Sequence, residues 1–160
     1  RMIPEGGSIM IALIENKGKL AKELFVDNAL NYDISDFNLV TSGKHMISLE
    51  DEPVFLSDPI EAFTFDFRNF ENIYKDKKTI KIEANKIGVC AGIIQWIKLD
   101  LYDDIEYQNN PLAMYQSNSV SGWKTPIFKF NEPVNVTKGQ LLNIQAVLEE
   151  DHSWFSLSPL

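Results

Sequence analysis

The chain has 160 residues, a net charge of −8 and an apolar content of 44%. This length and composition fit one folded domain with a sizeable core and exclude a disordered chain. The acidic charge repels phosphate backbones, so we expect no nucleic-acid binding, whereas it suits a basic partner such as an Arg-containing protein. No apolar run reaches the roughly 18 residues of a membrane span, so we expect no membrane contact.

A strand and a helix are predicted at the start of the chain. Residues 8–15 form an apolar run rich in isoleucine, which favours a strand. Over residues 17–28 the apolar period changes, because Leu20 and Leu24 share one helical face at i, i+4 spacing. This segment is the main predicted helix, and Asp33 or Ser35 is a candidate cap for a short second helical turn.

Strands dominate the rest of the chain, where turn signals recur about every ten residues. Residues 62–67 alternate strictly between phenylalanine and smaller or polar residues. Residues 88–102 form the longest β-like stretch, in which Gly88 or Gly92 is suited to a bend. The other predicted strands are 45–49, 79–84, 123–130, 134–136, 140–148 and 153–157, of which the last two form a hairpin.

Two segments are predicted to interrupt the strands. Residues 103–120 are polar and contain the breaker Asn109-Asn110-Pro111, so a loop is expected there. Residues 131–133 predict a turn. Together these patterns predict a single all-β domain over residues 1–160, an antiparallel barrel or sandwich with one helical insertion.

Residues with catalytic or ligating chemistry are scarce. The chain has no Gly-x-Gly-x-x-Gly motif and no P-loop, so we expect no cofactor to bind it. His45 and His152 have no His or Cys neighbour at metal-ligand spacing, so no metal is expected. Cys90 with His152 is a conceivable thiol–imidazole pair, but an apolar strand favours a buried, inert thiol. One cysteine permits no internal disulfide, which is typical of a reducing compartment and predicts a cytoplasmic protein.

Motifs of one known family recur in order along the chain. Ile3-Pro4 leads into the strand 8–15, which ends in Ile-Glu, and Asn31-Tyr32-Asp33-Ile34-Ser35 follows. The long strand carries Trp96, and Ser121-Gly122-Trp123-Lys124 precedes Pro133-Val134-x-Val136-x-Lys138-Gly139. The ending Glu150-Asp151-His152-Ser153-Trp154-Phe155-Ser156-Leu157 completes the series. In order and spacing they resemble the C-terminal β-barrel domain of the protein arginine N-methyltransferases, above all members with duplicated modules.

The resemblance implies an antiparallel β-barrel of roughly eight to ten strands. In the family, the motif that binds S-adenosylmethionine and the double-glutamate loop both belong to a preceding domain. We therefore expect this chain to be a non-catalytic domain of a longer methyltransferase, which holds the cofactor and the catalytic residues elsewhere. The start at Arg1, which has no signal-peptide pattern, is typical of the interior of such a protein.

Two sites are implied by the same resemblance. Ser121, Gly122, Trp123 and Lys124 would form a wall of the groove for an arginine substrate, and Gly122 stands where the family has a histidine. Residues 17–39, here called the arm, would dock on a partner subunit in a homodimer. The arm contact residues would be Leu20, Leu24, Phe25 and Val26, although the same side chains are equally suited to covering this chain's own barrel.

Two other functions are open at the level of sequence. A free-standing β-sandwich that binds carbohydrate would use Trp123, Trp154, Tyr107 and Tyr115 as stacking platforms. A small hydrolase would use paired carboxylates, for which acidic clusters at residues 100–106 and 149–151 are candidates. Both clusters fall where predicted strands end, and solvated carboxylates are normal at such positions.

Overall fold

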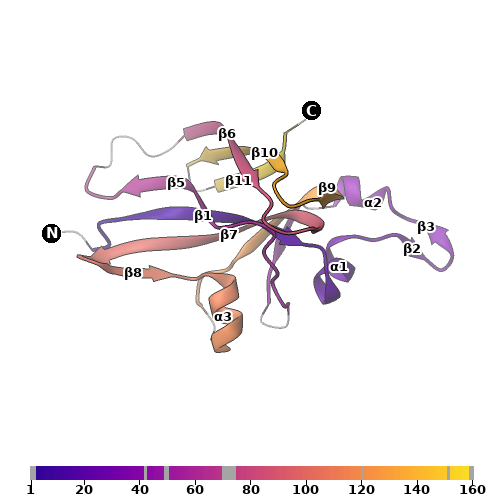
Figure 1. The fold of residues 1–160 in the computed structure, drawn as a ribbon, viewed down its shortest axis with the longest axis horizontal. Coiled ribbons are helices and arrows are strands. Elements are labelled where there is room, and N and C mark those ends of the chain that lie inside the picture. Colours follow the sequence, from indigo (N-terminus) through magenta and orange to yellow (C-terminus); the bar gives the residue numbers. More distant parts are fainter. Residues whose placement is uncertain are drawn as a thin grey trace.

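The computed structural model describes residues 3–41, 43–48, 51–69, 75–119, 121–150 and 152–158 (Figure 1). In these residues the strands pair antiparallel throughout, and no helix has the length and apolarity that crossing a bilayer requires. The described elements, in chain order, are β1 (Gly6–Glu15), α1 (Gly18–Leu24), β2 (Asn28–Ala29), β3 (Tyr32–Asp33), α2 (Phe37–Val40), β4 (Lys44–Met46), β5 (Ile60–Asp66), β6 (Lys75–Glu83), β7 (Gly88–Tyr102), β8 (Ile105–Gln108), α3 (Pro111–Ser117), β9 (Pro126–Val136), β10 (Leu141–Glu149) and β11 (His152–Leu157).

The strands form two main sheets and a small hairpin. The larger sheet has the order β4-β9-β7-β1-β5, with β8 added to the end of β7. The smaller sheet has the order β11-β10-β6, and β2 pairs with β3 away from both (Figure 1). The all-β antiparallel class is therefore confirmed. The predicted closed barrel is not, because hydrogen bonding among the described residues divides the strands between separate sheets.

The main core lies between the two sheets. Ile11 and Leu13 of β1 and Ile93 of β7 point toward the smaller sheet, where Ile144 and Phe155 meet them, and all five side chains are buried. A hydrogen bond of 2.6 Å from Ser153 Oγ to Gln95 Oε1 also joins the sheets. Each Å² of apolar surface removed from water contributes about 25 cal/mol to the free energy of folding, so this layer contributes strongly to stability.

A second core covers the opposite face of the larger sheet. Ala12 and Ile14, which alternate with the residues above, face Leu20 and Leu24 of α1. Trp96 stacks on Phe55 there, with ring centroids 5.5 Å apart. β1 is thus buried on both faces, which explains its nearly continuous apolar sequence.

The long strand β7 changes its alternation at Gly92, one of the two glycines that the sequence marks as suited to a bend. Cys90 faces the main core, whereas Ala91 and Ile94 face the second core, so the alternation changes phase near Gly92. The pairing with β9 shifts register at the same place. A Cβ atom at Gly92 would lie 2.1 Å from the carbonyl oxygen of Phe128, so only glycine permits this approach.

The predicted loop at 103–120 is wrong, because it contains β8 and α3. The breaker Asn109-Asn110-Pro111 begins a helix: the Asn110 side chain accepts hydrogen bonds from the amides of Leu112 and Ala113, with Pro111 in the first turn. The predicted turn at 131–133 is also wrong, since β9 runs through it. Those residues form an irregularity in the pairing with β7, where Cys90 opposes Val134 and Gly92 opposes Lys129.

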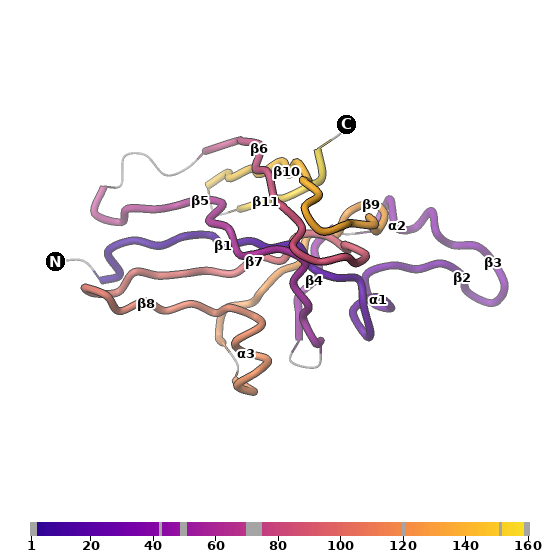
Figure 2. The backbone as a smooth tube through the Cα atoms, in the orientation of Figure 1, coloured from indigo at the N-terminus to yellow at the C-terminus, as the bar shows by residue number. Residues whose placement is uncertain are grey.

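The predicted helix at 17–28 is shorter in the structure. It ends at Leu24, and Phe25 already has extended backbone angles. The Asn38 side chain accepts from the amide of Val26 at 3.0 Å and donates to its carbonyl at 2.8 Å, so the backbone of Val26 bonds to Asn38 rather than within a helix. Figure 2 shows the chain leaving α1, running out to the β2–β3 hairpin and returning through α2.

Candidate functional site

The predicted groove residues form an exposed loop between α3 and β9. Trp123 is 52% exposed, and the edge of its ring contacts Tyr107 with centroids 5.6 Å apart. The Ser121 hydroxyl accepts a hydrogen bond from the amide of Trp123 and lies 3.0 Å from the Tyr107 hydroxyl. Gly122 and Lys124 are exposed beside them. The loop therefore presents an aromatic face with hydroxyl groups at its edge.

Asn109 holds this loop against the larger sheet, a role that sequence reasoning missed. The residue is 1% exposed. Its side-chain oxygen accepts from the amide of Ile97 at 2.8 Å, and its side-chain nitrogen donates to the carbonyl of Trp123 at 3.2 Å. A buried asparagine with both ends bonded orients its neighbours. In the sequence Asn109 belongs to the breaker Asn109-Asn110-Pro111. Its role could not be predicted, because only folding brings Trp123 next to it.

A small pocket of about 160 Å³ adjoins Trp123. Pro111, Met114 and Tyr115 of α3 form one side, and Asp51 contributes a carboxylate. A hydrogen bond with the Glu52 carboxylate raises the pKa of Tyr115. The pocket combines aromatic walls with acidic groups, which suits a flat or cationic group.

The predicted arm residues separate into two groups. Leu20 and Leu24 are buried against this chain's own sheet, as part of the second core. Phe25 is half-buried, and Val26 is exposed at the surface. The first pair thus covers the domain itself, so a contact with a partner would need other side chains of the arm.

Exposed apolar side chains gather instead beyond Val26. Leu30 is 91% exposed and Val40 78% exposed, and between them Tyr32, Phe37 and Leu39 are exposed as well. We call residues 28–40 the tip segment. From the sequence, Tyr32 was part of a family motif and most of this segment was part of the arm, but none of these side chains was predicted as a contact residue. The reason is that α2 and the β2–β3 hairpin are too short to show a periodic pattern.

Lys129 anchors the base of the arm to β9. Its ammonium donates to the carbonyl of Leu24 at 3.2 Å and to the Thr41 hydroxyl at 2.8 Å. It also lies 5.3 Å from the centre of the Phe25 ring. Burial lowers the pKa of Lys129. One side chain therefore fixes to the larger sheet both the end of α1 and the chain that follows α2.

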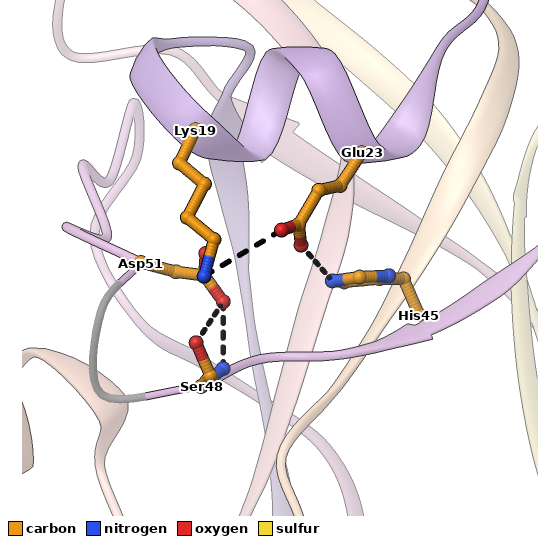
Figure 3. A network of polar contacts seen from close by, with 5 residues as sticks. All are labelled: Lys19, Glu23, His45, Ser48 and Asp51. Carbon is orange, nitrogen blue, oxygen red and sulfur yellow. Dashed lines mark hydrogen bonds and ion pairs between the residues drawn. The ribbon is translucent and has the colours of Figure 1, made fainter.

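A polar cluster lies between α1 on one side and β4 with the residues after it on the other (Figure 3). His45 Nε2 is 3.3 Å from Glu23 Oε2, and Lys19 Nζ is 3.5 Å from Glu23 Oε1. Asp51 Oδ2 accepts hydrogen bonds from the amide and the hydroxyl of Ser48, at 2.7 and 2.9 Å. Sequence spacing gave no sign of this cluster, since its members come from separate segments.

Cys90 is unsuited to nucleophilic chemistry. The side chain is fully buried in the main core, and burial raises the pKa of its thiol to about 12. A thiolate is the reactive form of cysteine, so a thiol held protonated at neutral pH is inert. His152, the other member of the conceivable pair, is exposed at the start of β11.

The other sequence candidates are scattered. Trp123, Tyr107 and Tyr115 lie near one pocket, whereas Trp154 packs edge-on against Phe128 with centroids 5.4 Å apart. In the cluster at residues 100–106, Glu106 pairs with Lys98 at 2.8 Å on the sheet surface. Of the other carboxylates in the two clusters, Asp104 and Glu149 are exposed at the surface.

Among the described residues, the turn after β1 differs from the glycine-rich turn of a nucleotide-type cofactor site. Nucleotide-type cofactors bind where a glycine-rich turn joins a strand to a helix. β1 is followed by Asn16 and Lys17, and Gly18 is already the first residue of α1, a helix of seven residues. No step of methyl transfer is therefore assigned to this chain.

The chain is an antiparallel β domain of two packed sheets. The arm projects from it, and the 121–124 loop exposes Trp123 at its surface. No family model matches the chain. The chain is 30% identical over 112 residues to Protein arginine N-methyltransferase 7 from Oryza sativa subsp. indica, and equally to that from subsp. japonica. The match covers 62% of the chain and 15% of each relative.

A solved structure shows the same fold. It is the Trypanosoma brucei PRMT1 enzyme–prozyme heterotetrameric complex with AdoHcy, with a TM-score of 0.72 and 11% identity. The superposition covers 99% of this chain and 58% of that one. The chain thus resembles the barrel domain of the protein arginine N-methyltransferases, and it spans a small part of the length of the curated relatives.

Proposed function

We propose that this chain is the β domain of an S-adenosylmethionine-dependent protein arginine N-methyltransferase-like protein. In this role its strands close into the family's barrel, its 121–124 loop forms one wall of the substrate groove, and its arm makes a subunit contact. The observation that carries the proposal is the structural match over 99% of the chain, together with 30% identity to curated arginine methyltransferases. A domain that holds the methyl donor belongs to another part of the protein.

The groove assignment rests on the chemistry of the loop. A guanidinium group is flat, cationic and weakly hydrated, so it stacks well on aromatic rings. Trp123 and Tyr107 supply such rings at the surface, and Ser121 fixes their relative position through its hydroxyl. The net charge of −8 favours approach of an Arg-rich protein. The loop would orient the substrate while another domain supplies the reacting groups.

The subunit contact is assigned to the tip segment. Leu30 and Asn31 have φ angles of 51° and 68°, a left-handed conformation that leucine adopts at a cost. Folding of this chain gains little from a leucine that is 91% exposed in that conformation. A partner surface that buries Leu30, Leu39 and Val40 supplies a reason for it. The methyl-donor domain of a second subunit is the occupant we propose.

The test uses the complete protein that contains this chain, with labelled S-adenosylmethionine and an arginine-rich peptide. We expect label on arginine, and Trp123→Ala should lower kcat/KM by about tenfold or more because substrate orientation is lost. Trp154→Ala is the matched control, since Trp154 packs on Phe128 rather than in the loop. Absence of label on arginine contradicts the function, and equal kcat/KM for Trp123→Ala contradicts the groove role alone.

The carbohydrate-binding alternative is not favoured. Trp123, Tyr107 and Tyr115 come from the 121–124 loop, β8 and α3, whereas Trp154 lies on β11 and packs against Phe128. The similar proteins are methyltransferases. The single, fully buried cysteine also suits the reducing cytoplasm proposed for the protein.

A further inference from the structure

Three metal-ligating side chains converge from separate parts of the fold. Glu23 comes from α1, His45 from β4, and Asp51 from the segment before β5 (Figure 3). One donor atom of each lies within 4.8 Å of the other two. A helix, a strand and a loop thus aim one imidazole and two carboxylates at a common point.

The state of the donor atoms points to a missing ligand. Asp51 is 1% exposed, and its Oδ1 accepts no hydrogen bond from the described residues. His45 Nε2 is also buried and lacks an aligned hydrogen bond there, although Glu23 lies 3.3 Å away. A buried carboxylate oxygen left unpaired costs about 1–3 kcal/mol or more. Such groups are expected where an ion completes the site.

We propose that Glu23, His45 and Asp51 bind a divalent transition-metal ion, best matched by Zn²⁺. Imidazole nitrogen with carboxylate oxygen is a zinc donor set, whereas Ca²⁺ and Mg²⁺ prefer oxygen alone. Three protein ligands leave a fourth position for water. The site is built from this chain's own residues and is independent of the proposed methyltransferase function.

The geometry is close to what zinc requires. Ligands about 2.1 Å from a tetrahedral ion stand about 3.4 Å apart, and Glu23 Oε2 and His45 Nε2 are already 3.3 Å apart. The donor atom of Asp51 lies within 4.8 Å of the other two, so it needs to approach by at most about 1.4 Å to reach this spacing. Ser48 holds that carboxylate through two hydrogen bonds, as an outer-shell partner does at a metal site.

Lys19 occupies the site in the absence of metal. Its ammonium lies 3.5 Å from Glu23 Oε1 and partly neutralises that carboxylate. The side chain is 44% exposed and flexible, so it withdraws into solvent when an ion of higher charge binds. Zinc affinity should therefore increase when this competing cation is removed.

The experiment titrates the chelator-treated chain with ZnCl2 by calorimetry and measures bound zinc by elemental analysis after desalting. We expect one zinc ion per chain and the intense visible absorption of tetrahedral Co²⁺ when cobalt replaces zinc. His45→Ala should weaken binding by about a hundredfold, and Ser48→Ala by about tenfold. Lys19→Met should strengthen binding, an effect that a stray surface histidine would not show.

His152→Ala is the matched control, because it removes the other histidine of the chain and should leave zinc affinity unchanged. Circular dichroism of each variant establishes that it is folded. Wild-type affinity for His45→Ala, or equal losses for His45→Ala and His152→Ala, would show adventitious binding and overturn the site. No bound zinc after desalting would overturn it as well.

Discussion

The base of the arm and its tip segment differ in where their apolar side chains lie. At its base, α1 buries Leu20 and Leu24 against the larger sheet, and Lys129 bonds the chain on both sides. In the tip segment the apolar side chains are exposed, and Leu30 adopts a left-handed conformation. The base is therefore part of the core of this domain, whereas the apolar side chains of the tip segment lie on its surface.

This contrast separates stability from association within one insertion. Changes at the base should affect the free energy of unfolding, because they act on packed contacts. Changes in the tip segment should leave folding nearly untouched and act on assembly, since those side chains pack on little of this chain. The first three predictions below test the contrast and the fourth compares it with the main core, in order from the largest expected effect on stability to the smallest.

Leu24→Asp should destabilise the chain by about 3–5 kcal/mol, because it removes a packed leucine and buries an unpaired charge. The free energy of unfolding from urea denaturation measures this. Leu24→Met keeps the volume and should cost less than about 1.5 kcal/mol. A loss under about 1 kcal/mol for Leu24→Asp would mean that the base is not part of the core.

Lys129→Met should cost about 1–2 kcal/mol, since two hydrogen bonds from one ammonium disappear while its apolar stem remains. Hydrogen exchange at the Thr41 amide, which donates to the carbonyl of Phe37, should become faster. Lys124→Met is the control, because Lys124 is exposed in the 121–124 loop. Unchanged exchange at Thr41 would show that Lys129 does not anchor the arm.

Leu30→Asn should stabilise the isolated chain by up to about 1 kcal/mol, because asparagine tolerates a positive φ. The same change should weaken subunit association of the complete protein in sedimentation equilibrium. Lys22→Asn, an exposed change in α1, serves as the control for association. An unaltered sedimentation profile for Leu30→Asn would remove the tip segment from the interface.

The last prediction concerns Cys90 in the main core, because the ionisation of its thiol has almost no effect on the free energy of unfolding at neutral pH. Burial raises the pKa of its thiol from 9.0 to about 12, so the folded chain keeps a proton that the unfolded chain loses. This stability is fully present below pH 9 and is lost as the pH rises toward 12. Cys90→Ala should flatten that part of the curve of unfolding free energy against pH. If the free energy of unfolding falls equally with pH in both proteins, the thiol of Cys90 is not buried in the way described.

Some features could be predicted from the sequence because they depend on neighbouring residues. The period-2 pattern of 88–102 and the final hairpin match β7, β10 and β11 closely. The register shift in β7 falls at Gly92, one of the two glycines marked in the sequence, because glycine in a long strand often accompanies an irregularity. Two predictions failed because side chains override local propensity: Asn110 begins a helix where a breaker was expected, and Asn38 bonds to Val26 where a helix was expected to continue.

By itself the sequence determined the antiparallel β class, the apolar faces of the strands and the resemblance to arginine methyltransferases. Only the tertiary structure decided that Leu20 and Leu24 turn inward while Leu30 stays exposed, and that Asn109 holds Trp123. It also decided that Glu23, His45 and Asp51 meet. The physical reason is that strand patterns come from local backbone geometry, whereas burial and ligand clusters depend on which distant segments the sheets bring together.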